Sequence, residues 1–194
     1  MGGKTHAAAG ALCAVTACVF LKQTDPFSLS LGLCAGAVGA LAPDIDVDGS
    51  IGNKAVKKII PTVVFIVLVA VLALFSKGQS IGVGFLRLLA VGVLLVMTFL
   101  GLGSAHREKT HSVFFCVVST LCIAALISDA AIFWLIGYMS HLMLDVLNTK
   151  GCSYLWPLKG KYCLGLCKAS GVVNTAIFYA SSALTIITLV FALV

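Results

Sequence analysis

Residues 130–147 read Ala-Ala-Ile-Phe-Trp-Leu-Ile-Gly-Tyr-Met-Ser-His-Leu-Met-Leu-Asp-Val-Leu, an almost unbroken apolar run that contains His141 and Asp145. A helix needs about 20 largely apolar residues to cross the hydrocarbon core of a bilayer, so this run predicts a membrane helix. Two ionisable side chains inside such a helix are costly unless they face a polar interior or a cation. The stretch therefore predicts both the fold class and the place of a polar site.

The composition of the whole chain is that of a membrane protein. Of its 194 residues, 60% are hydrophobic and 10% are charged, and the mean hydropathy is +1.11. Soluble domains carry about 25% charged residues. A chain this apolar would leave much apolar surface exposed to water in a soluble fold. We therefore expect one membrane-embedded domain over residues 1–194, without a separate soluble module.

Further apolar segments predict an all-α, polytopic integral membrane bundle of about seven transmembrane helices. The segments lie at approximately 5–21, 27–43, 59–76, 81–102, 112–128, 130–147 and 172–194. The fifth and sixth are separated only by Ser128 and Asp129, which favours a tight helical hairpin.

The basic residues predict the orientation of this bundle. When the loops are assigned alternately to the two membrane faces, ten lysines and arginines fall on one face and two, Lys22 and Lys77, on the other. Basic loops stay in the cytoplasm, so the N-terminus is expected there. All four histidines then lie at the cytoplasmic face. The net charge of +6 suits anionic lipid headgroups, and we expect no nucleic-acid partner.

Carboxylates and imidazoles stand at the ends of the apolar segments. His141 and Asp145 are four residues apart, which places both on one helix face. Asp44 and Asp46 alternate in the turn after Pro43. Each pair has a simpler interpretation, since a His–Asp pair can lock two helices together and alternating aspartates can form a solvated turn.

Two more histidines, His106 and His111, lie five residues apart in a short polar loop, and His6 begins the first segment. Their spacing is not that of a zinc-protease helix. Arg107, beside His106, could hold a phosphate or carboxylate through two hydrogen bonds. The simpler interpretations are a basic cytoplasmic loop and an interfacial histidine.

Taken together, these residues predict a metal site. Imidazole suits zinc, iron, nickel and copper, whereas carboxylates suit magnesium and manganese. The candidate ligands are His6, Asp44, Asp46, His111, His141 and Asp145. This set exceeds the four ligands of a structural zinc site. It favours two divalent ions about 3.5–4 Å apart, as in phosphoesterases.

The same residues resemble the YdjM family, bacterial and archaeal inner-membrane proteins regarded as membrane-bound, metal-dependent hydrolases. The matching blocks are Lys4-Thr5-His6, Pro43-Asp44-Ile45-Asp46, His106-Arg107, Thr110-His111-Ser112, residues 137–145 and Leu155-Trp156-Pro157. They span most of the chain in the expected order. Glu108 and Lys109 follow the His-Arg pair where the family usually carries a glycine or another small residue.

The resemblance implies a multi-pass protein of the bacterial or archaeal cytoplasmic (inner) membrane that binds metal and catalyses hydrolysis. It implies the same six residues as ligands. It also implies two catalytic residues. His106 would be a ligand or would hold one, and Arg107 would stabilise negative charge in the transition state.

We therefore expect a phosphoesterase-like hydrolase that uses a metal-activated water at the cytoplasmic face. Its cofactor would be a divalent metal, Zn, Mn or Mg, in one or two ions. Its substrate would be an ester or phosphoester of a lipid or of another membrane-associated molecule, so membrane lipid is the expected partner. The alternatives are a metal-ion transporter or sensor, and a membrane protein with a structural metal site.

Overall fold

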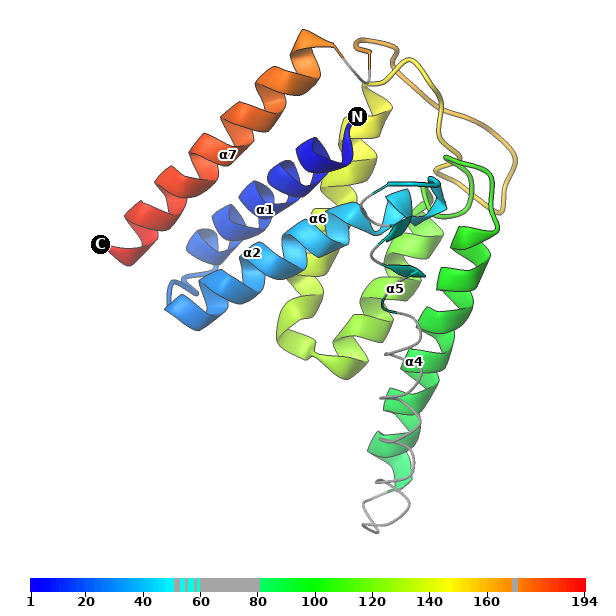
Figure 1. Ribbon diagram of the computed structural model, residues 1–194. Coiled ribbons are helices and arrows are strands. Elements are labelled where there is room, and N and C mark those ends of the chain that lie inside the picture. The colour runs from blue at the N-terminus through cyan, green and yellow to red at the C-terminus, as the bar shows by residue number, and fades with distance from the viewer. Residues whose placement is uncertain (51–52, 55, 58, 60–80, 169–170) are drawn as a thin grey trace.

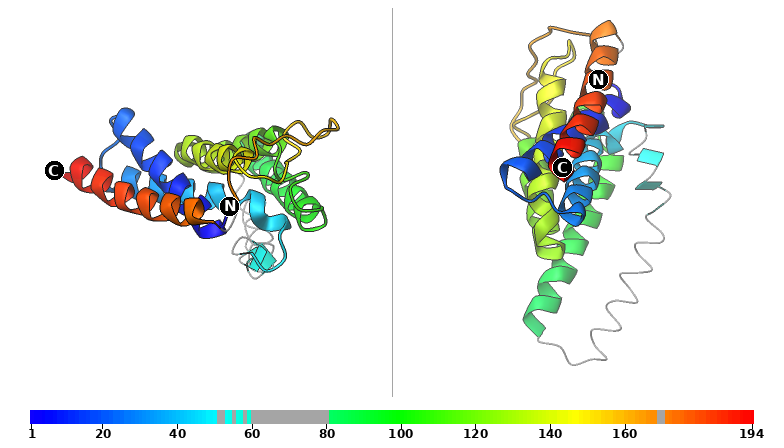
Figure 2. Two further views of the ribbon diagram at one scale, coloured as in Figure 1. Left: turned by 90° about the horizontal axis from the view of Figure 1, so that it is seen from above. Right: turned by 90° about the vertical axis from the view of Figure 1, so that its left-hand side faces the viewer.

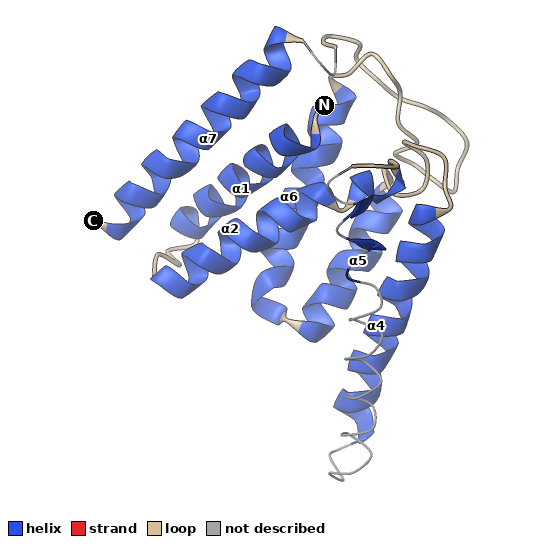
Figure 3. Ribbon diagram, viewed as in Figure 1, coloured by secondary structure: helices blue, strands red, loops and turns tan. Residues whose placement is uncertain are grey.

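The computed structural model describes residues 1–50, 53–54, 56–57, 59, 81–168 and 171–194. Within these ranges the regular structure is helical and there is no β-strand, so the all-α prediction is confirmed for the described residues (Figure 3). The elements are α1 (Gly3–Phe20), α2 (Pro26–Leu41), the 3-10 turn η1 (Pro43–Asp46), α4 (Ile81–Leu102), α5 (Val113–Leu126), α6 (Ser128–Val146) and α7 (Val172–Leu193).

Three of the described helices are long and apolar enough to cross a membrane. They are α2 with η1, most of α4 (Gly82–Leu102), and α7. Helix α5 is apolar but has only 14 residues, and the polar residues of α1 and α6 lower their hydropathy. The count of about seven spanning helices is therefore not reached within the described residues. The segment predicted at 59–76 lies outside them.

Small residues bring three helices into close contact at the centre of the bundle. A Cβ added to Gly36 of α2 would lie 2.6 Å from the carbonyl oxygen of Gly10 in α1. A Cβ added to Gly137 of α6 would lie 2.8 Å from the carbonyl carbon of Gly36 and would overlap the oxygen. Helix backbones approach this closely in lipid through small residues, so α2 is held between α1 and α6.

The remaining helices extend this centre to either side (Figures 1 and 2). Helix α7 packs on α1, α5 packs on α6, and α4 packs on α5. Both outer helices expose large apolar side chains, such as Phe85 and Phe99 of α4 and Phe191 of α7. Exposed apolar surface of this extent is what a bilayer covers.

The polar connections gather at one end of the bundle (Figure 1). The start of α1, η1, the loop after α4 and the segment between α6 and α7 meet there. Hydrogen bonds tie two of these loops together, because Ser153 N donates to the carbonyl of Arg107 at 3.1 Å and Val113 N donates to that of Tyr154 at 2.9 Å. Trp156 packs against Phe115 with ring centroids 5.7 Å apart. This end carries the predicted site.

Candidate metal centre

The structure brings the six predicted ligands into one buried cluster. His6 lies in the first turn of α1, Asp44 and Asp46 in η1, His111 just before α5, and His141 and Asp145 in the last turns of α6. The side chains of the three histidines His6, His111 and His141 have at most 1% of their surface exposed. Residues up to 139 positions apart in the chain therefore share one site because the three central helices meet here.

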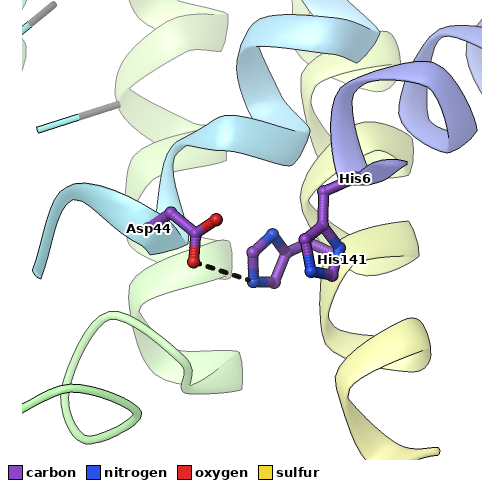
Figure 4. Close-up of side chains that lie close together, drawn as sticks. All are labelled: His6, Asp44 and His141. Atoms are coloured by element: carbon purple, nitrogen blue, oxygen red, sulfur yellow. Dashed lines mark ion pairs between the residues drawn. The ribbon is translucent and has the colours of Figure 1, made fainter. Parts of the chain in front are cut away.

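His6 lies flat against His141, with ring centroids 3.7 Å apart and an angle of 19° between the planes (Figure 4). Its Nε2 is 3.3 Å from Asp145 Oδ1. Yet among the described residues neither ring nitrogen of His6 has an aligned hydrogen-bond partner. Buried polar atoms without a partner are costly and rare. These nitrogens are therefore suited to a ligand other than the protein itself.

The hydrogen bonds of His141 fix which of its nitrogens has a free lone pair. Nδ1 lies 2.7 Å from the carbonyl oxygen of Ala40, which can only accept, so Nδ1 carries the proton. The lone pair is then on Nε2. This atom is 3.8 Å from Asp44 Oδ1 and 3.9 Å from Asp145 Oδ2. A protonated nitrogen on a backbone carbonyl is the usual arrangement of metal-binding histidines.

His111 is oriented in the same way from the other side. The Thr110 hydroxyl donates to Asp46 Oδ2 at 2.8 Å, so it accepts from His111 Nδ1 at 3.2 Å. The Nε2 of His111 then also has a free lone pair, and this atom lies 3.2 Å from His141 Nε2. Two lone pairs repel at this distance unless a proton or a metal cation lies between them. The donor set thus fits a cation.

Asp145 is held by positive groups at the edge of this cluster. Its Oδ1 accepts from the amino group of Met1 at 2.7 Å, and its Oδ2 lies 3.2 Å from the Arg107 guanidinium. Cys152 Sγ is 3.8 Å from Oδ2. Burial raises the pKa of this thiol to about 11, so it is neutral at physiological pH and donates to the carboxylate.

The two predicted catalytic residues lie beside the ligands. Arg107 is buried and has a left-handed backbone, with φ of 67°. Such a conformation is uncommon for a residue other than glycine and is found at functional sites. The Arg107 Nε donates to His106 Nε2 at 3.2 Å, and its guanidinium also donates to the carbonyl of Lys150. The His106 side chain is 42% exposed, so it stands at the rim of the cluster.

Three overlapping groups of side chains have atoms close enough to hold a metal ion, all within 4.8 Å of one another. The groups are His6, Asp44 and His141; His111, His141 and Asp145; and Asp46, His106 and His111. The first two share His141. The third joins them only through His111.

The sequence did not indicate several residues that orient these side chains. The Ala40 carbonyl carries no signal in the sequence, since it is a backbone atom of an ordinary helix. Thr110 belongs to one of the matching blocks, but the contact of its hydroxyl with both Asp46 and His111 depends on the fold. The Tyr138 hydroxyl donates to the Thr110 carbonyl, and only its place one turn before His141 could have suggested that role.

The comparisons with known proteins identify the family of the chain. No curated protein and no solved structure gives a significant match. A family model described as "YdjM inner membrane protein" matches residues 1–194, the whole chain. The predicted resemblance and the predicted inner-membrane location are confirmed. The chain therefore belongs to the YdjM family of inner membrane proteins.

Proposed function

We propose that this protein is a membrane-bound, metal-dependent hydrolase that acts on an ester or phosphoester of a lipid or of another membrane-associated substrate. The proposal includes about seven spanning helices and a centre that faces the cytoplasm. One observation carries it. Two histidine Nε2 lone pairs face each other at 3.2 Å inside a buried cluster of carboxylates, an arrangement that a metal cation between them would stabilise.

The residues present divide into those that would hold a divalent ion and those that would handle substrate. His6, His111 and His141, with Asp44 and Asp145, supply nitrogen and oxygen donors that zinc and manganese accept. A divalent ion in such a site polarises ester oxygens and makes water more acidic. The Arg107 guanidinium stands 3.2 Å from Asp145, where it would bind the negative charge of a phosphoester.

His106 would hold this arginine in place. Its Nε2 accepts from Arg107 Nε at 3.2 Å, so its Nδ1 carries the proton that faces Asp46 Oδ1 at 3.1 Å. Both ring nitrogens are therefore engaged. The role that fits this geometry is orientation of Arg107 at the rim, where substrate would enter.

A cavity near the centre favours an amphiphilic substrate. It has a volume of about 400 Å³ and lies between the first turns of α1 and α7. Polar residues Lys4 and Ser50 and aromatic residues Phe178 and Tyr179 line it. The Ser50 hydroxyl donates to the backbone carbonyl of Asp44 at 2.6 Å, so one lining residue contacts the turn that carries a candidate ligand. A lipid has both kinds of surface.

The test compares hydrolysis with transport in the same preparation. Full-length protein would be assayed with an aryl phosphomonoester, an aryl phosphodiester, a carboxylic ester and a phospholipid in mixed micelles. We expect metal-dependent turnover of at least one substrate, lost in His141→Ala and retained in Asp48→Ala, because Asp48 is exposed and pairs only with Lys57 in the described residues. Metal flux into proteoliposomes without turnover would instead establish a transporter.

A further inference from the structure

We infer that the centre binds a single divalent ion through His6, Asp44, His111, His141 and Asp145, and that Asp46 is a positioning residue rather than a ligand. This inference rests on the proposed metal centre but not on the reaction that it catalyses. It differs from the expectation of six ligands and two ions that the sequence favours.

Both carboxylate oxygens of Asp46 already have partners in the protein. Oδ1 lies 3.1 Å from His106 Nδ1. Oδ2 accepts from Arg107 N at 3.0 Å and from the Thr110 hydroxyl at 2.8 Å, and it is 3.3 Å from His111 Nδ1. The side chain is fully buried. A metal ion at Oδ2 would have to displace donors from Arg107 and Thr110, which are buried, and would leave them unpaired at a cost of about 1–3 kcal/mol each. An ion at Oδ1 would have to compete with His106.

His111 lies between Asp46 and the other candidate ligands. Asp46 lies beside Nδ1 of His111, whereas Asp145 and Asp44 lie beside its Nε2, at 3.6 and 3.9 Å. An ion at Asp46 and an ion among the other ligands would therefore bind opposite edges of one imidazole ring. Two metal–nitrogen bonds of about 2.0–2.1 Å each already add up to the distance between the ions of two-metal hydrolases, which is about 3.5–4 Å. The width of the imidazole ring would place the two ions still further apart. That geometry does not suit two cooperating ions.

The charge of the cluster also favours one ion over two. Asp44, Asp46 and Asp145 contribute three negative charges, and Arg107 and the amino group of Met1 contribute two positive ones. With neutral histidines the cluster carries one negative charge. One divalent ion changes this to one positive charge, which a singly charged phosphodiester or hydroxide neutralises. Two ions would leave three positive charges in a buried site, which is far more costly.

The role that remains for Asp46 is to set the position of two neighbours. Through Thr110 it fixes the proton on His111 Nδ1 and so leaves Nε2 free for the ion. Through His106 and the Arg107 backbone it fixes the loop that carries the guanidinium. Partners of this kind change metal affinity by about 10–100-fold when they are lost.

The experiment measures metal content and cobalt affinity of full-length protein purified in detergent. Wild type should hold one zinc ion per chain. Asp46→Asn should also hold one, with a cobalt affinity 10–100-fold lower and the visible absorption bands of bound cobalt at unchanged wavelengths. Asp145→Asn should lose or shift these bands, because a ligand is removed. Asp48→Asn, on the same loop, should match wild type in every measurement.

Two results would overturn the inference. One is two ions per wild-type chain, falling to one in Asp46→Asn or in His106→Ala. The other is a shifted cobalt spectrum in Asp46→Asn. If Asp46→Asn does not fold, the wild-type stoichiometry and the His106→Ala variant still decide between one ion and two. Absence of hydrolysis with one ion bound would count against the proposed function alone.

Discussion

Replacing Gly137 by alanine should disturb the metal centre from one helical turn away. Gly137 of α6 packs on Gly36 of α2, and the residues four positions further along these helices, His141 and Ala40, form the 2.7 Å hydrogen bond that orients the imidazole. The two contacts therefore lie one turn apart on the same pair of helices. A substitution that moves the two glycines apart therefore also moves His141 away from the Ala40 carbonyl.

The size of the effect follows from the distances. The new Cβ would lie 2.8 Å from the Gly36 carbonyl carbon, against about 3.5 Å for the closest unstrained contact of carbon atoms. The helices must move apart by at least about 0.7 Å, which lengthens the His141–Ala40 contact to about 3.4 Å and all but breaks it. Overpacking costs about 1–3 kcal/mol and the hydrogen bond about 1 kcal/mol. The better helix propensity of alanine recovers about 1 kcal/mol, so the net loss is about 1–3 kcal/mol.

The assay combines thermal unfolding with cobalt titration of the detergent-purified protein. Gly137→Ala should unfold at a lower temperature and bind cobalt about 10–100-fold more weakly. The control is Gly92→Ala in α4, where no described atom lies within 4 Å of the added Cβ, and it should retain both properties. Wild-type cobalt affinity in Gly137→Ala would refute the link between the helix crossing and the centre.

Three further outcomes can be checked on the same preparation. Arg107→Ala should keep the bound metal and lower turnover of a phosphodiester at least tenfold; loss of metal, measured by elemental analysis, would show that the arginine is part of the binding set. Ser112→Ala should destabilise the protein by about 1 kcal/mol in thermal or denaturant unfolding, because the hydroxyl caps α5 by accepting from Phe115 N at 3.2 Å, and an unchanged midpoint would contradict this. At pH 7–8, Cys152 should react with a maleimide far more slowly than the exposed Cys163, since its pKa is raised to about 11 by burial and the thiolate is the reactive form; equal labelling by mass spectrometry would argue against its burial.

Much of the helical architecture was predictable because hydrophobic length is a local property of the chain. The segments expected at 81–102 and 172–194 correspond to α4 and α7, and the hairpin expected around Ser128 is present between α5 and α6. The number of spanning helices was less predictable. The helices that carry His6 and His141 contain polar residues that face the interior, and these residues lower the mean hydropathy of each helix. Apolar length alone therefore overestimates the number of helices that are apolar enough to cross a membrane.

The candidate centre was predictable as a set of residues but not as a set of roles. Spacing placed His141 and Asp145 on one face of α6, and this holds in the structure. The division between Asp44 and Asp46 could not be deduced, because it depends on which hydrogen-bond donors the loop after α4 brings to each carboxylate. The same is true of the stacking of His6 on His141, which depends on how α1 crosses α6.

Helix α7 has a consequence for how the centre is assembled in the cell. It is hydrogen-bonded to the first turn of α1, next to His6. Asn174 Oδ1 accepts from Gly2 N at 3.0 Å, and the Asn174 carbonyl accepts from the Thr5 hydroxyl at 3.4 Å. Helix α7 also follows every candidate ligand in the order of translation. These two hydrogen bonds can form only after the ribosome has made Asn174. A nascent chain would therefore acquire its metal late, once membrane insertion of the bundle is nearly finished.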